Sequence, residues 1–511
     1  MAHRSLDNLF RLKKSLDKVP IPSCSGRKDK SDSGLTILYQ NIESSSDAGR
    51  AFFVPAISAH SFFMENSNGI HHFNKGASCI LFHKTNRSRN QLFMEAHKQL
   101  TIGLFGFGVV GEGLYKVLQQ TASLKASIKK VCIKNPGKKR NAPAELFTTD
   151  PAILLNDPQI NVIVEVINES EAAFVIVSTA LQNGKDVVSA SKKMIAEHLP
   201  ELLGLQTKTG RSFLYEAAAC ASIPVIRNLE EYYDNDLLHS IRAIVNGSTN
   251  FILTKMFEDK LDFKQALLLA QQLGFAESDP TLDVEGFDAV NKWALLLTHA
   301  YGIVEHPSQI VFNGIQNIQQ GDATVAAEKH YDIKLVAQAK KLLNGKVAAF
   351  VLPQFVKQDD HLAFVKNEYN GVVIESGFSD KQFFYGKGAG SFPTASAVLS
   401  DLSALRYQYK YEYKKLYHHR PHELTDDFYV KAYISFDDWK HIPKENFEWI
   451  EEWHAETDRK YLVAVMQFSA LAKNDWWREN NNSLILSPEG VIEDMEIRKL
   501  KKKSLELAGI F

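Results

Sequence analysis

The 511-residue sequence has few cysteines, almost no net charge and no long apolar run. Its four cysteines are scattered without a CxxC pair, which argues against a disulfide framework or a zinc knuckle and suits a reducing cytoplasm. The formal net charge is -1, so no excess of one sign draws the whole chain to nucleic acid or to an anionic membrane. No apolar run approaches the ~18 residues that a membrane-spanning helix needs. We therefore expect a cytoplasmic protein without nucleic-acid or membrane partners.

Residues 1–97 differ in composition from the rest of the chain. They are rich in Ser, Asn and His, and patches such as PSCSGRKDKSDSG are typical of turns or disorder. The start RLKKSLDK is basic like a transit peptide, but acidic residues such as Asp7 and Asp17 occur throughout, which such peptides avoid. We expect a poorly ordered, possibly non-native extension, and our hypothesis is that the natural chain starts at Met94.

The remaining sequence divides into three parts. From 98 to 222, short apolar runs alternate with helical segments, which predicts βαβ units and a parallel sheet. From 223 to 405, long helical patterns dominate, with antiparallel strands expected in AFVLPQFVKQDDHLAFVKNEYNGVVIE, so we expect an α+β domain. From 406 to 511, the runs FYVKAYISF, KYLVAVMQF and SLILS predict three strands with helices between them in a small α+β domain.

A glycine-rich loop lies in the stretch TIGLFGFGVVGEGLYKVL, residues 101–118. Gly106, Gly108 and Gly111 have GxGxxG spacing, which allows a tight turn, close approach of backbone to a pyrophosphate, and close packing of helix on strand. The loop follows an apolar strand and opens an amphipathic helix, and this context favours a dinucleotide site over a plain turn. We therefore predict a Rossmann-type doubly wound parallel sheet whose loop binds the cofactor through Gly106, Phe107, Gly108, Val109, Val110 and Gly111.

The second expected strand, IKKVCIK, is followed by a basic loop. NAD sites usually have an acid here that binds the ribose 2′-hydroxyl, but no acid occurs between Glu112 and Glu145. The loop KNPGKKR instead supplies cations suited to a 2′-phosphate. The pattern favours NADP over NAD, a solvated basic turn being the alternative. The cations are Lys134, Lys138, Lys139 and Arg140.

The segment LGFAESDPTLDVEGFDAVNKWALLL, residues 273–297, holds five carboxylates ahead of Lys292. In a helix starting at Phe287, Asp288 and Lys292 are i and i+4 and share one face. Such pairs are usually exposed and contribute a few tenths of a kcal/mol, but the apolar neighbours here indicate a partly buried face. A carboxylate that holds an ammonium group is what proton transfer to a substrate oxygen requires. The pair is a candidate for catalysis, with an ordinary surface ion pair as the alternative.

Five motifs together resemble the homoserine dehydrogenase family over about residues 99–405. They are, in order, the glycine loop, VVSASKKMIAE, NGSTNFILTKM, GFAESDPTLDVEGFDAVNK and YGKGAGSFPTASAVLSDL. The resemblance implies the reversible NAD(P)-dependent reduction of L-aspartate 4-semialdehyde to L-homoserine, in threonine and methionine biosynthesis. It also implies a homodimer or a dimer of dimers, with substrate binding, catalysis and dimerisation in the 223–405 domain.

The resemblance further assigns roles to single residues. Lys192 and Lys292 match the family's catalytic lysines, one of which gives a proton to the carbonyl oxygen as hydride arrives, and Asp288 orients Lys292. Glu277 and Asp283 match residues that hold the amino acid part of the substrate. The chemistry agrees, because acidic residues suit the substrate's ammonium group and lysines suit the developing alkoxide. Lys192 is also expected at the substrate and the cofactor, and the small loop with Gly388 and Gly390 is expected to fold over the nicotinamide.

A monovalent cation, most simply sodium, is also implied by the resemblance. The loop YEAAACASIP matches the family's cation loop. Alanine and isoleucine can offer only carbonyl oxygens, which suit a hard, weakly charged ion better than zinc. An ordinary packed strand end is the alternative. The residues around the ion would be Glu216, Ala219, Ala221 and Ile223.

The two ends of the chain depart from other members of the family. Residues 1–97 are too short for the aspartate kinase domain that some members carry, so we expect a monofunctional, bacterial-type enzyme. The tail 406–511 has a possible β-α-β-α-β order but lacks the usual PGVL-like start of an ACT domain. We expect an ACT-like or family-specific domain, and inhibition by threonine stays open.

Two rival functions remain at this point. A dehydrogenase with a thiol nucleophile would use Cys220, but the nearest charge, Glu216, would raise the pKa of this thiol, so a small buried cysteine is the better interpretation. A non-catalytic NADP-binding sensor would keep the glycine loop, but it would not need Lys192, Asp288 and Lys292, which are all present.

Overall fold

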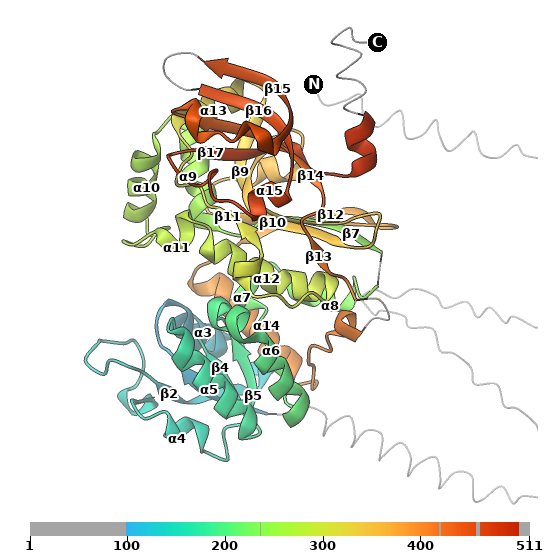
Figure 1. Cartoon of the computed structure of the whole chain (residues 1–511). Helices are drawn as coiled ribbons and strands as arrows, with labels where there is room; N and C mark the ends of the chain where they lie inside the picture. The colour runs from blue at the N-terminus through green and yellow to red at the C-terminus, as the bar shows by residue number, and fades with distance from the viewer. Residues whose placement is uncertain (1–98, 236, 418–420, 456–459, 500–511) are drawn as a thin grey trace, which may run out of the picture. The chain divides into compact units, whose positions relative to one another are not determined.

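The computed structural model describes residues 99–235, 237–417, 421–455 and 460–499 (Figure 1). The expectations about residues 1–97 and a start at Met94 lie outside the described residues. No helix within the described ranges combines the length and the apolar character needed to cross a membrane.

The first part of the chain forms a six-stranded sheet in the order β3-β2-β1-β4-β5-β6, with every neighbouring pair parallel. The residues of β4 and β5 are all buried, as expected for parallel strands that are covered on both faces. This order confirms the predicted Rossmann-type doubly wound sheet. The strands are β1 (Leu100–Phe105), β2 (Ala126–Cys132), β3 (Phe147–Thr148), β4 (Val162–Glu165), β5 (Asp186–Ser189) and β6 (Phe213–Leu214).

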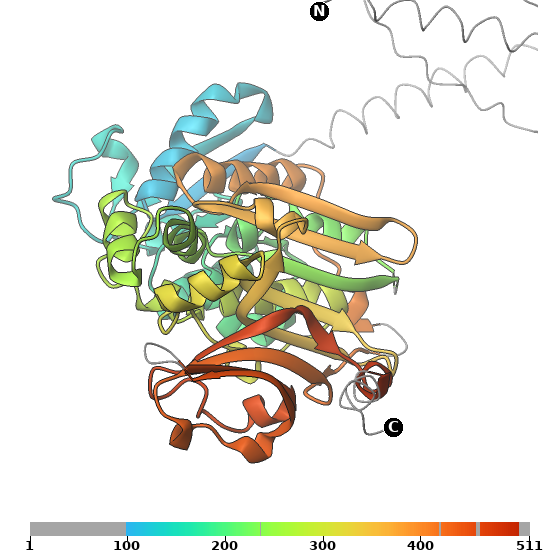
Figure 2. The same ribbon diagram turned by 90° about the horizontal axis from the view of Figure 1, so that it is seen from above.

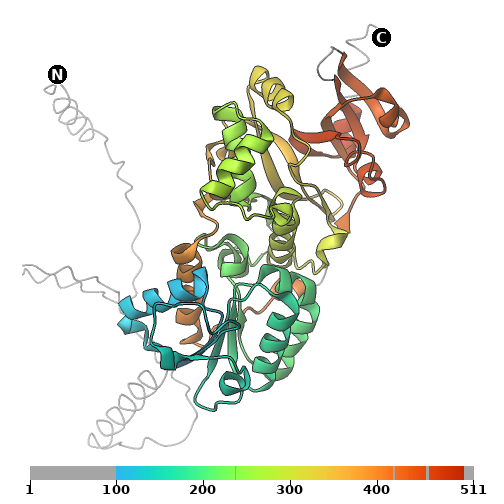
Figure 3. The same ribbon diagram turned by 90° about the vertical axis from the view of Figure 1, so that its left-hand side faces the viewer.

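Helices cover both faces of this sheet, and one of them comes from much later in the sequence. Figure 3 shows the blue α3 (Val109–Gln120) and the orange α14 (Ser391–Leu405) on one side of the strands, with the green α5 (Ser170–Gln182) and α6 (Lys192–Thr209) on the other. Helix α14 contacts both α3 and β5. The short α4 (Ala152–Leu155) contacts β1 and β2. The segment after α14 therefore starts beside the parallel sheet of the first part and continues into the tail.

The second sheet has eleven strands and extends from the middle of the chain into the tail. Its order is β12-β11-β7-β9-β10-β17-β14-β16-β15, with β8 and β13 also paired to β10. Strands β10 and β11, both within the run expected to form antiparallel strands, pair antiparallel with β9 and β7 rather than with each other. The strands are β7 (Leu238–Ile244), β8 (Val311–Phe312), β9 (Tyr331–Lys341), β10 (Val347–Lys357), β11 (Tyr369–Ser376), β12 (Asp380–Lys387), β13 (Leu424–Thr425), β14 (Tyr429–Phe436), β15 (Phe447–Ala455), β16 (Lys460–Gln467) and β17 (Ser483–Ile492).

Helix α12 (Phe287–Tyr301) is the central helix of this part. Thirteen of its fifteen residues are buried, which is typical of a helix surrounded by other elements. It lies between Gly286 and Gly302, whose φ angles of 91° and 70° suit glycine best. The other helices of the middle part and the tail are α7 (Ala217–Cys220), α8 (Val225–Glu231), α9 (Gly247–Glu258), α10 (Phe263–Gln272), α11 (Thr281–Val284), α13 (Gln320–Glu328) and α15 (Ser469–Ala472).

The tail contains the three predicted strands, but the predicted β-α-β-α-β order is wrong. An additional strand, β15, stands where a helix was expected between β14 and β16, and it pairs antiparallel with β16. Its Glu-rich sequence favours a helix by propensity, but Trp449 packs on Val465 and Ile492, and this tertiary packing decides the conformation. A parallel pairing of β17 with β10 joins the tail to the sheet of the middle part, and Figure 2 shows the red tail strands beside the yellow and orange strands.

Candidate active site

One buried carboxylate binds two lysines from different parts of the chain. Asp288 and Lys292 lie one turn apart on α12, as predicted, and Lys292 Nζ is 2.7 Å from Asp288 Oδ2. Lys192, the first residue of α6, places its Nζ 2.9 Å from the other oxygen, Oδ1. Burial alone would raise the pKa of Asp288, but the two lysines outweigh this effect and hold that pKa well below its ordinary value. Asp288 is therefore ionised, and its carboxylate joins Lys192 of α6 to Lys292 of α12.

The two lysines differ in their exposure. The side chain of Lys192 is 42% exposed and that of Lys292 is 8% exposed. Lys292 Nζ also donates to Val245 O at 2.8 Å, so two of its three hydrogens point to protein acceptors. The carboxylates of Asp288, Asp283 and Glu277 raise the pKa of Lys192, against the opposing effect of burial. Lys192 is thus a protonated group that can reach a bound molecule, while Lys292 is held in place behind it.

Asn246 connects the predicted acidic residues, although the sequence analysis gave it no role. Its Nδ2 donates to Asp283 Oδ1 at 2.7 Å and to Asp288 Oδ2 at 2.8 Å. Its Oδ1 accepts from Thr249 N at 2.8 Å and caps the start of α9. An Asn directly before a helical run is a signal for the cap, but no local pattern shows the links to the two acids.

The other two predicted acids lie at the open side of the lysines. Asp283 is half-buried, and both burial and the negative charge of Asp288 raise its pKa. Glu277 is exposed and lines the cleft that also contains the glycine loop. The structure thus brings Lys192, Lys292, Asp288 and Asp283 together and places Glu277 at the edge.

A cleft of about 840 Å³ lies at the carboxyl ends of the first parallel strands. Its volume is in the range that small-molecule and cofactor sites usually have. The predicted loop residues Gly106, Phe107, Gly108, Val109 and Val110 line it, together with Lys134, Lys138, Arg140 and Glu277. Gly111 lies outside this lining and instead packs on the backbone of Gly106.

The three positions of the loop hold glycine for different physical reasons. Gly106 has a φ of 96°, and a Cβ there would lie 2.8 Å from Val166 O. A Cβ on Gly111 would collide with Gly106 O, so this position is needed for helix-to-strand packing. A Cβ on Gly108 would meet no protein atom within 4 Å, which leaves the backbone of Gly108 open to the cleft. The first and third glycines thus serve the fold, and the second fits a ligand.

The basic loop after β2 is partly braced by its own arginine. Arg140 donates from Nη1 to Lys138 O and from Nη2 to Asn135 O, each at 2.7 Å. Lys134 and Lys138 are exposed and line the cleft, whereas Lys139 is exposed and is absent from the lining. Arg140 therefore shapes the loop, and two of its lysines face the cleft.

The second glycine-containing loop lies against the first. Ser391 follows Gly390, and its Oγ donates to Val109 O at 2.8 Å. Gly390 has a φ of 117°, and a Cβ on Gly388 would collide with the side chain of Asn370. The sequence distance between the loops is large, but the packing of α14 on α3 brings them together.

The proposed cation loop surrounds a buried carboxylate. Glu216 is 2% exposed, and its two oxygens accept from Ile226 N and Arg227 N at 2.9 Å each. Burial raises the pKa of Glu216 to about 7 and that of the nearby Asp401 to about 8, and Arg227 pairs with Asp401 at 2.8 Å. Ala221 has a φ of 43°, so the backbone turns sharply after α7. In the described ranges no group of three or more His, Cys, Asp or Glu side chains is arranged to hold a metal, so backbone oxygens would have to contribute.

Cys220 is a buried structural residue. It is 0% exposed, and burial raises the pKa of its thiol to about 12. A thiolate nucleophile requires a lowered pKa and access to substrate. The interpretation as a small buried cysteine is confirmed, and the thiol-based rival loses its basis.

Comparisons with known proteins agree on one family. The model described as "Homoserine dehydrogenase, NAD binding domain" matches residues 106–216, and the model "Homoserine dehydrogenase" matches residues 224–403. The chain is 36% identical over 317 residues to the homoserine dehydrogenase of Bacillus subtilis, covering 60% of this chain and 73% of that protein. It is 35% identical over 314 residues to that of Lactococcus lactis, covering 59% and 73%.

Solved structures give the same result. A homoserine dehydrogenase from Thiobacillus denitrificans superposes with a TM-score of 0.64 at 27% identity, covering 76% of this chain and 98% of that one. A hyperthermophilic archaeal homoserine dehydrogenase in complex with NADPH superposes with a TM-score of 0.52 at 26% identity, covering 61% and 99%.

We predict that Asn246→Ala separates the roles of this residue as a helix cap and as a link between acids. Loss of the cap should cost about 1 kcal/mol in the free energy of unfolding. Loss of the amide should also lower kcat/KM about tenfold, because Asp283 and Asp288 each lose a donor and repel each other. The matched control is Asp262→Ala, which removes the exposed cap of α10. Equal kcat/KM in the two variants would show that Asn246 is only a cap.

Proposed function

The chain belongs to the homoserine dehydrogenase family, and from this premise we propose which of its residues perform the reaction. The enzyme is an NAD(P)-dependent oxidoreductase that interconverts L-aspartate 4-semialdehyde and L-homoserine. The observation that carries the proposal is the carboxylate of Asp288, which binds Lys192 and Lys292 at 2.9 and 2.7 Å beside the cofactor cleft.

We propose that Lys192 protonates the substrate's carbonyl oxygen. When bound, NAD(P)H supplies the hydride that reduces the aldehyde. Lys192 is the more exposed lysine, and the surrounding carboxylates raise its pKa, so it carries a proton at neutral pH. Lys292 adds a second positive charge, which stabilises the alkoxide that develops on the oxygen.

Glu277 and Asp283 are proposed to bind the ammonium group of the substrate. Both lie near enough to Lys192 for their charges to raise its pKa, so they stand beside the lysine that is proposed to protonate the substrate. An amino acid with a terminal aldehyde can then place its two ends on groups of opposite charge. Gly388 and Gly390 are proposed to cover the nicotinamide, supported by the contact of Ser391 with the first glycine loop.

The lysine roles are tested by Lys192→Met and Lys292→Met. Each should lower kcat at least about a hundredfold, because one loses the proton donor and the other leaves Asp288 with only one of its two lysines. Lys193→Met, the exposed neighbour on α6, is the control and should keep normal turnover. Steady-state rates in both directions, with cofactor binding measured by fluorescence, would reveal the effects. Full activity in Lys292→Met would refute the proposed mechanism.

We propose NADP as the preferred cofactor. The support comes from Lys134 and Lys138, which line the cleft after β2, from the missing acid in this loop, and from the NADPH bound to the archaeal relative. Replacing both lysines by Ala should raise KM for NADPH about tenfold and leave KM for NADH nearly unchanged, since only NADPH has the 2′-phosphate. Lys139→Ala serves as the control, because this side chain lies outside the cleft lining. Equal changes for both cofactors would contradict the preference.

A sodium ion is proposed at the loop formed by Glu216, Ala219, Ala221 and Ile223. Glu216 and Asp401 are both buried there, and the guanidinium group of Arg227 pairs with Asp401, so a monovalent cation bound to the loop would stabilise the ionised form of Glu216. Sodium should therefore raise the Tm of salt-free protein more than tetramethylammonium does at equal ionic strength. An equal Tm in the two salts would exclude the site.

We further propose a cytoplasmic homodimer or dimer of dimers. Among the described strands, β12 is at one end of the larger sheet, and it exposes Tyr385 to 50%. Phe378, in the turn before it, is 89% exposed. Exposed aromatic side chains at a sheet edge favour association with a second copy. Light scattering that gives the mass of a single chain would rule this out.

A further inference from the structure

Residues 406–417, which follow α14 and which we call the strap, cross from the nucleotide-binding part to α12. Their sequence RYQYKYEYKKLY alternates in burial, because Tyr411 and Tyr413 are 0% and 5% exposed while Lys410 and Glu412 are exposed. This period of two is typical of an extended segment with one face on the protein. Tyr411 and Tyr413, at alternate positions of the strap, therefore point inward.

The first half of the strap is bound to the nucleotide-binding part. Ser212 Oγ donates to Tyr409 O and Gln206 Nε2 donates to Tyr411 O, each at 2.8 Å. Gln206 lies in the last turn of α6, the helix that begins with Lys192. The strap thus holds the end of α6 that is remote from the lysine.

The second half of the strap is bound to α12. Lys415 Nζ donates to His299 O at 2.7 Å and to Leu229 O at 2.8 Å. A Cβ on Gly302, at the end of α12, would lie 2.5 Å from Lys415 O, so the strap and the helix end are in close contact. Here too the strap holds the helix end that is remote from its catalytic groups.

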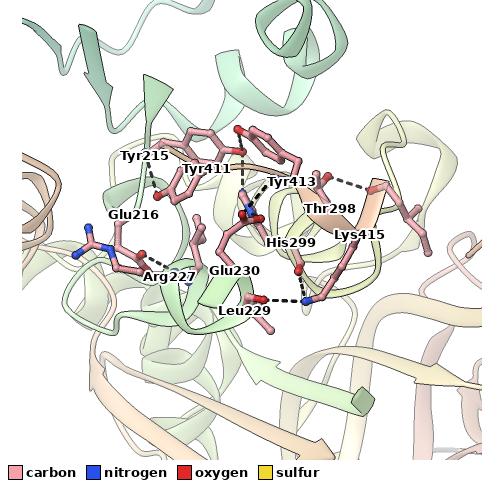
Figure 4. Close-up of polar contacts among 12 residues, drawn as sticks. Tyr215, Glu216, Arg227, Leu229, Glu230, Thr298, His299, Tyr411, Tyr413 and Lys415 are labelled. Atoms are coloured by element: carbon pink, nitrogen blue, oxygen red, sulfur yellow. Dashed lines mark hydrogen bonds and ion pairs between the residues drawn. The ribbon is translucent and has the colours of Figure 1, made fainter. Parts of the chain in front are cut away.

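Between these two halves, four buried residues form a closed ring of hydrogen bonds (Figure 4). Tyr413 Oη lies 3.0 Å from Tyr215 Oη, which lies 2.8 Å from His299 Nε2. His299 Nδ1 is 2.6 Å from Glu230 Oε1, and Glu230 Oε2 accepts from Tyr413 N at 3.2 Å. The ring joins the end of β6, α12, α8 and the strap.

The hydrogen bonds of the ring can all be satisfied with one placement of protons. An ionised Glu230 can only accept, so Nδ1 of His299 carries its hydrogen, and Nε2 accepts from Tyr215. Tyr413 then donates to Tyr215. Burial raises the pKa of Tyr215 well above its ordinary value, which keeps this phenol neutral. A fully satisfied buried ring of this kind is rigid.

Helices α6 and α12 are therefore connected at both of their ends. Their chains pack against each other, and their starts meet where Lys192 binds Asp288. Their far ends meet at the strap. The geometry of the lysine pair depends on the relative placement of the two helices, and the strap fixes that placement from the other end.

We propose that Tyr413 and its partners Tyr215, His299 and Glu230 are positioning residues for the reaction, which set the relation of Lys192 to Lys292 through the ends of α6 and α12. The inference rests on the proposed roles of the two lysines. None of the four residues is proposed to touch the substrate, because all four are buried and none of them lines the cleft.

The test compares Tyr413→Phe with Tyr407→Phe. Tyr413→Phe removes one hydroxyl from the ring and keeps the aromatic packing, whereas Tyr407 is 65% exposed on the same strap and serves as the control. In Tyr413→Phe, kcat should fall about tenfold, since small misplacements of catalytic groups have large effects on rate. KM for NADPH should change less than about twofold, because the cleft is untouched. The deuterium isotope effect with NADPH labelled at the transferred hydrogen should rise, because hydride transfer becomes slower relative to product release.

The outcomes separate positioning from stability alone. A kcat and isotope effect equal to those of Tyr407→Phe would overturn the inference, and so would a loss of kcat that disappears when the assay is run well below the Tm of the variant. If Tyr413→Phe does not fold, Glu230→Gln is the second variant, with the same expectations and the same grounds for rejection. Lys292→Met separates the proposed lysine roles from the proposed role of the strap. Normal turnover in Lys292→Met would refute the proposed roles of the lysines. Loss of turnover in Lys292→Met, with normal turnover in Tyr413→Phe or Glu230→Gln, would refute only the positioning role of the strap.

Discussion

The site depends on one buried carboxylate shared by two ammonium groups. A buried charge is costly unless it is paired, and a charge left without its partners is strongly destabilising. Asp288 is 7% exposed, and its oxygens are occupied by Lys192, Lys292 and the amide of Asn246. Lys192 begins α6, which covers the first sheet, and Asp288 lies in the first turn of α12, the central helix of the second part. The shared carboxylate therefore requires the two parts to meet at one place. The cleft with the glycine loop and the two lysines proposed to be catalytic are consequently neighbours.

The fold supports this meeting point from several directions. Glycines 106 and 111 allow α3 to start close to the sheet, and α14 returns from far along the chain to bring the second glycine loop beside the first. Asn246 ties the two acids to the start of α9. The strap then holds the opposite ends of α6 and α12. In physical terms, the two lysines and Asp288 are held by rigid elements and by hydrogen bonds to buried partners, and the proposed proton transfer needs such preorganisation.

What could be predicted from the sequence was mostly local. The GxGxxG spacing, the basic loop without an acid, and the i, i+4 relation of Asp288 and Lys292 follow from short-range geometry, so the sheet class and half of the site were accessible. The bond between Lys192 and Asp288 joins residues 96 positions apart, and only the family resemblance suggested that they work together. Asn246, the strap ring and the packing of α14 on α3 arise from tertiary contacts that leave no periodic pattern. Strand β15 was missed for a related reason, because its Glu-rich sequence has a low strand propensity and its pairing with β16 overrides this preference.

The measurement that tests this account most directly is the steady-state kcat/KM for homoserine of Asp288→Asn, made on protein that still binds NADPH and melts cooperatively. The substitution keeps the shape of the side chain but removes the charge that holds both lysines. We expect kcat/KM to fall at least about a hundredfold, since the lysines lose their common anchor. A value within about threefold of the wild-type enzyme would show that the shared carboxylate does not organise the site.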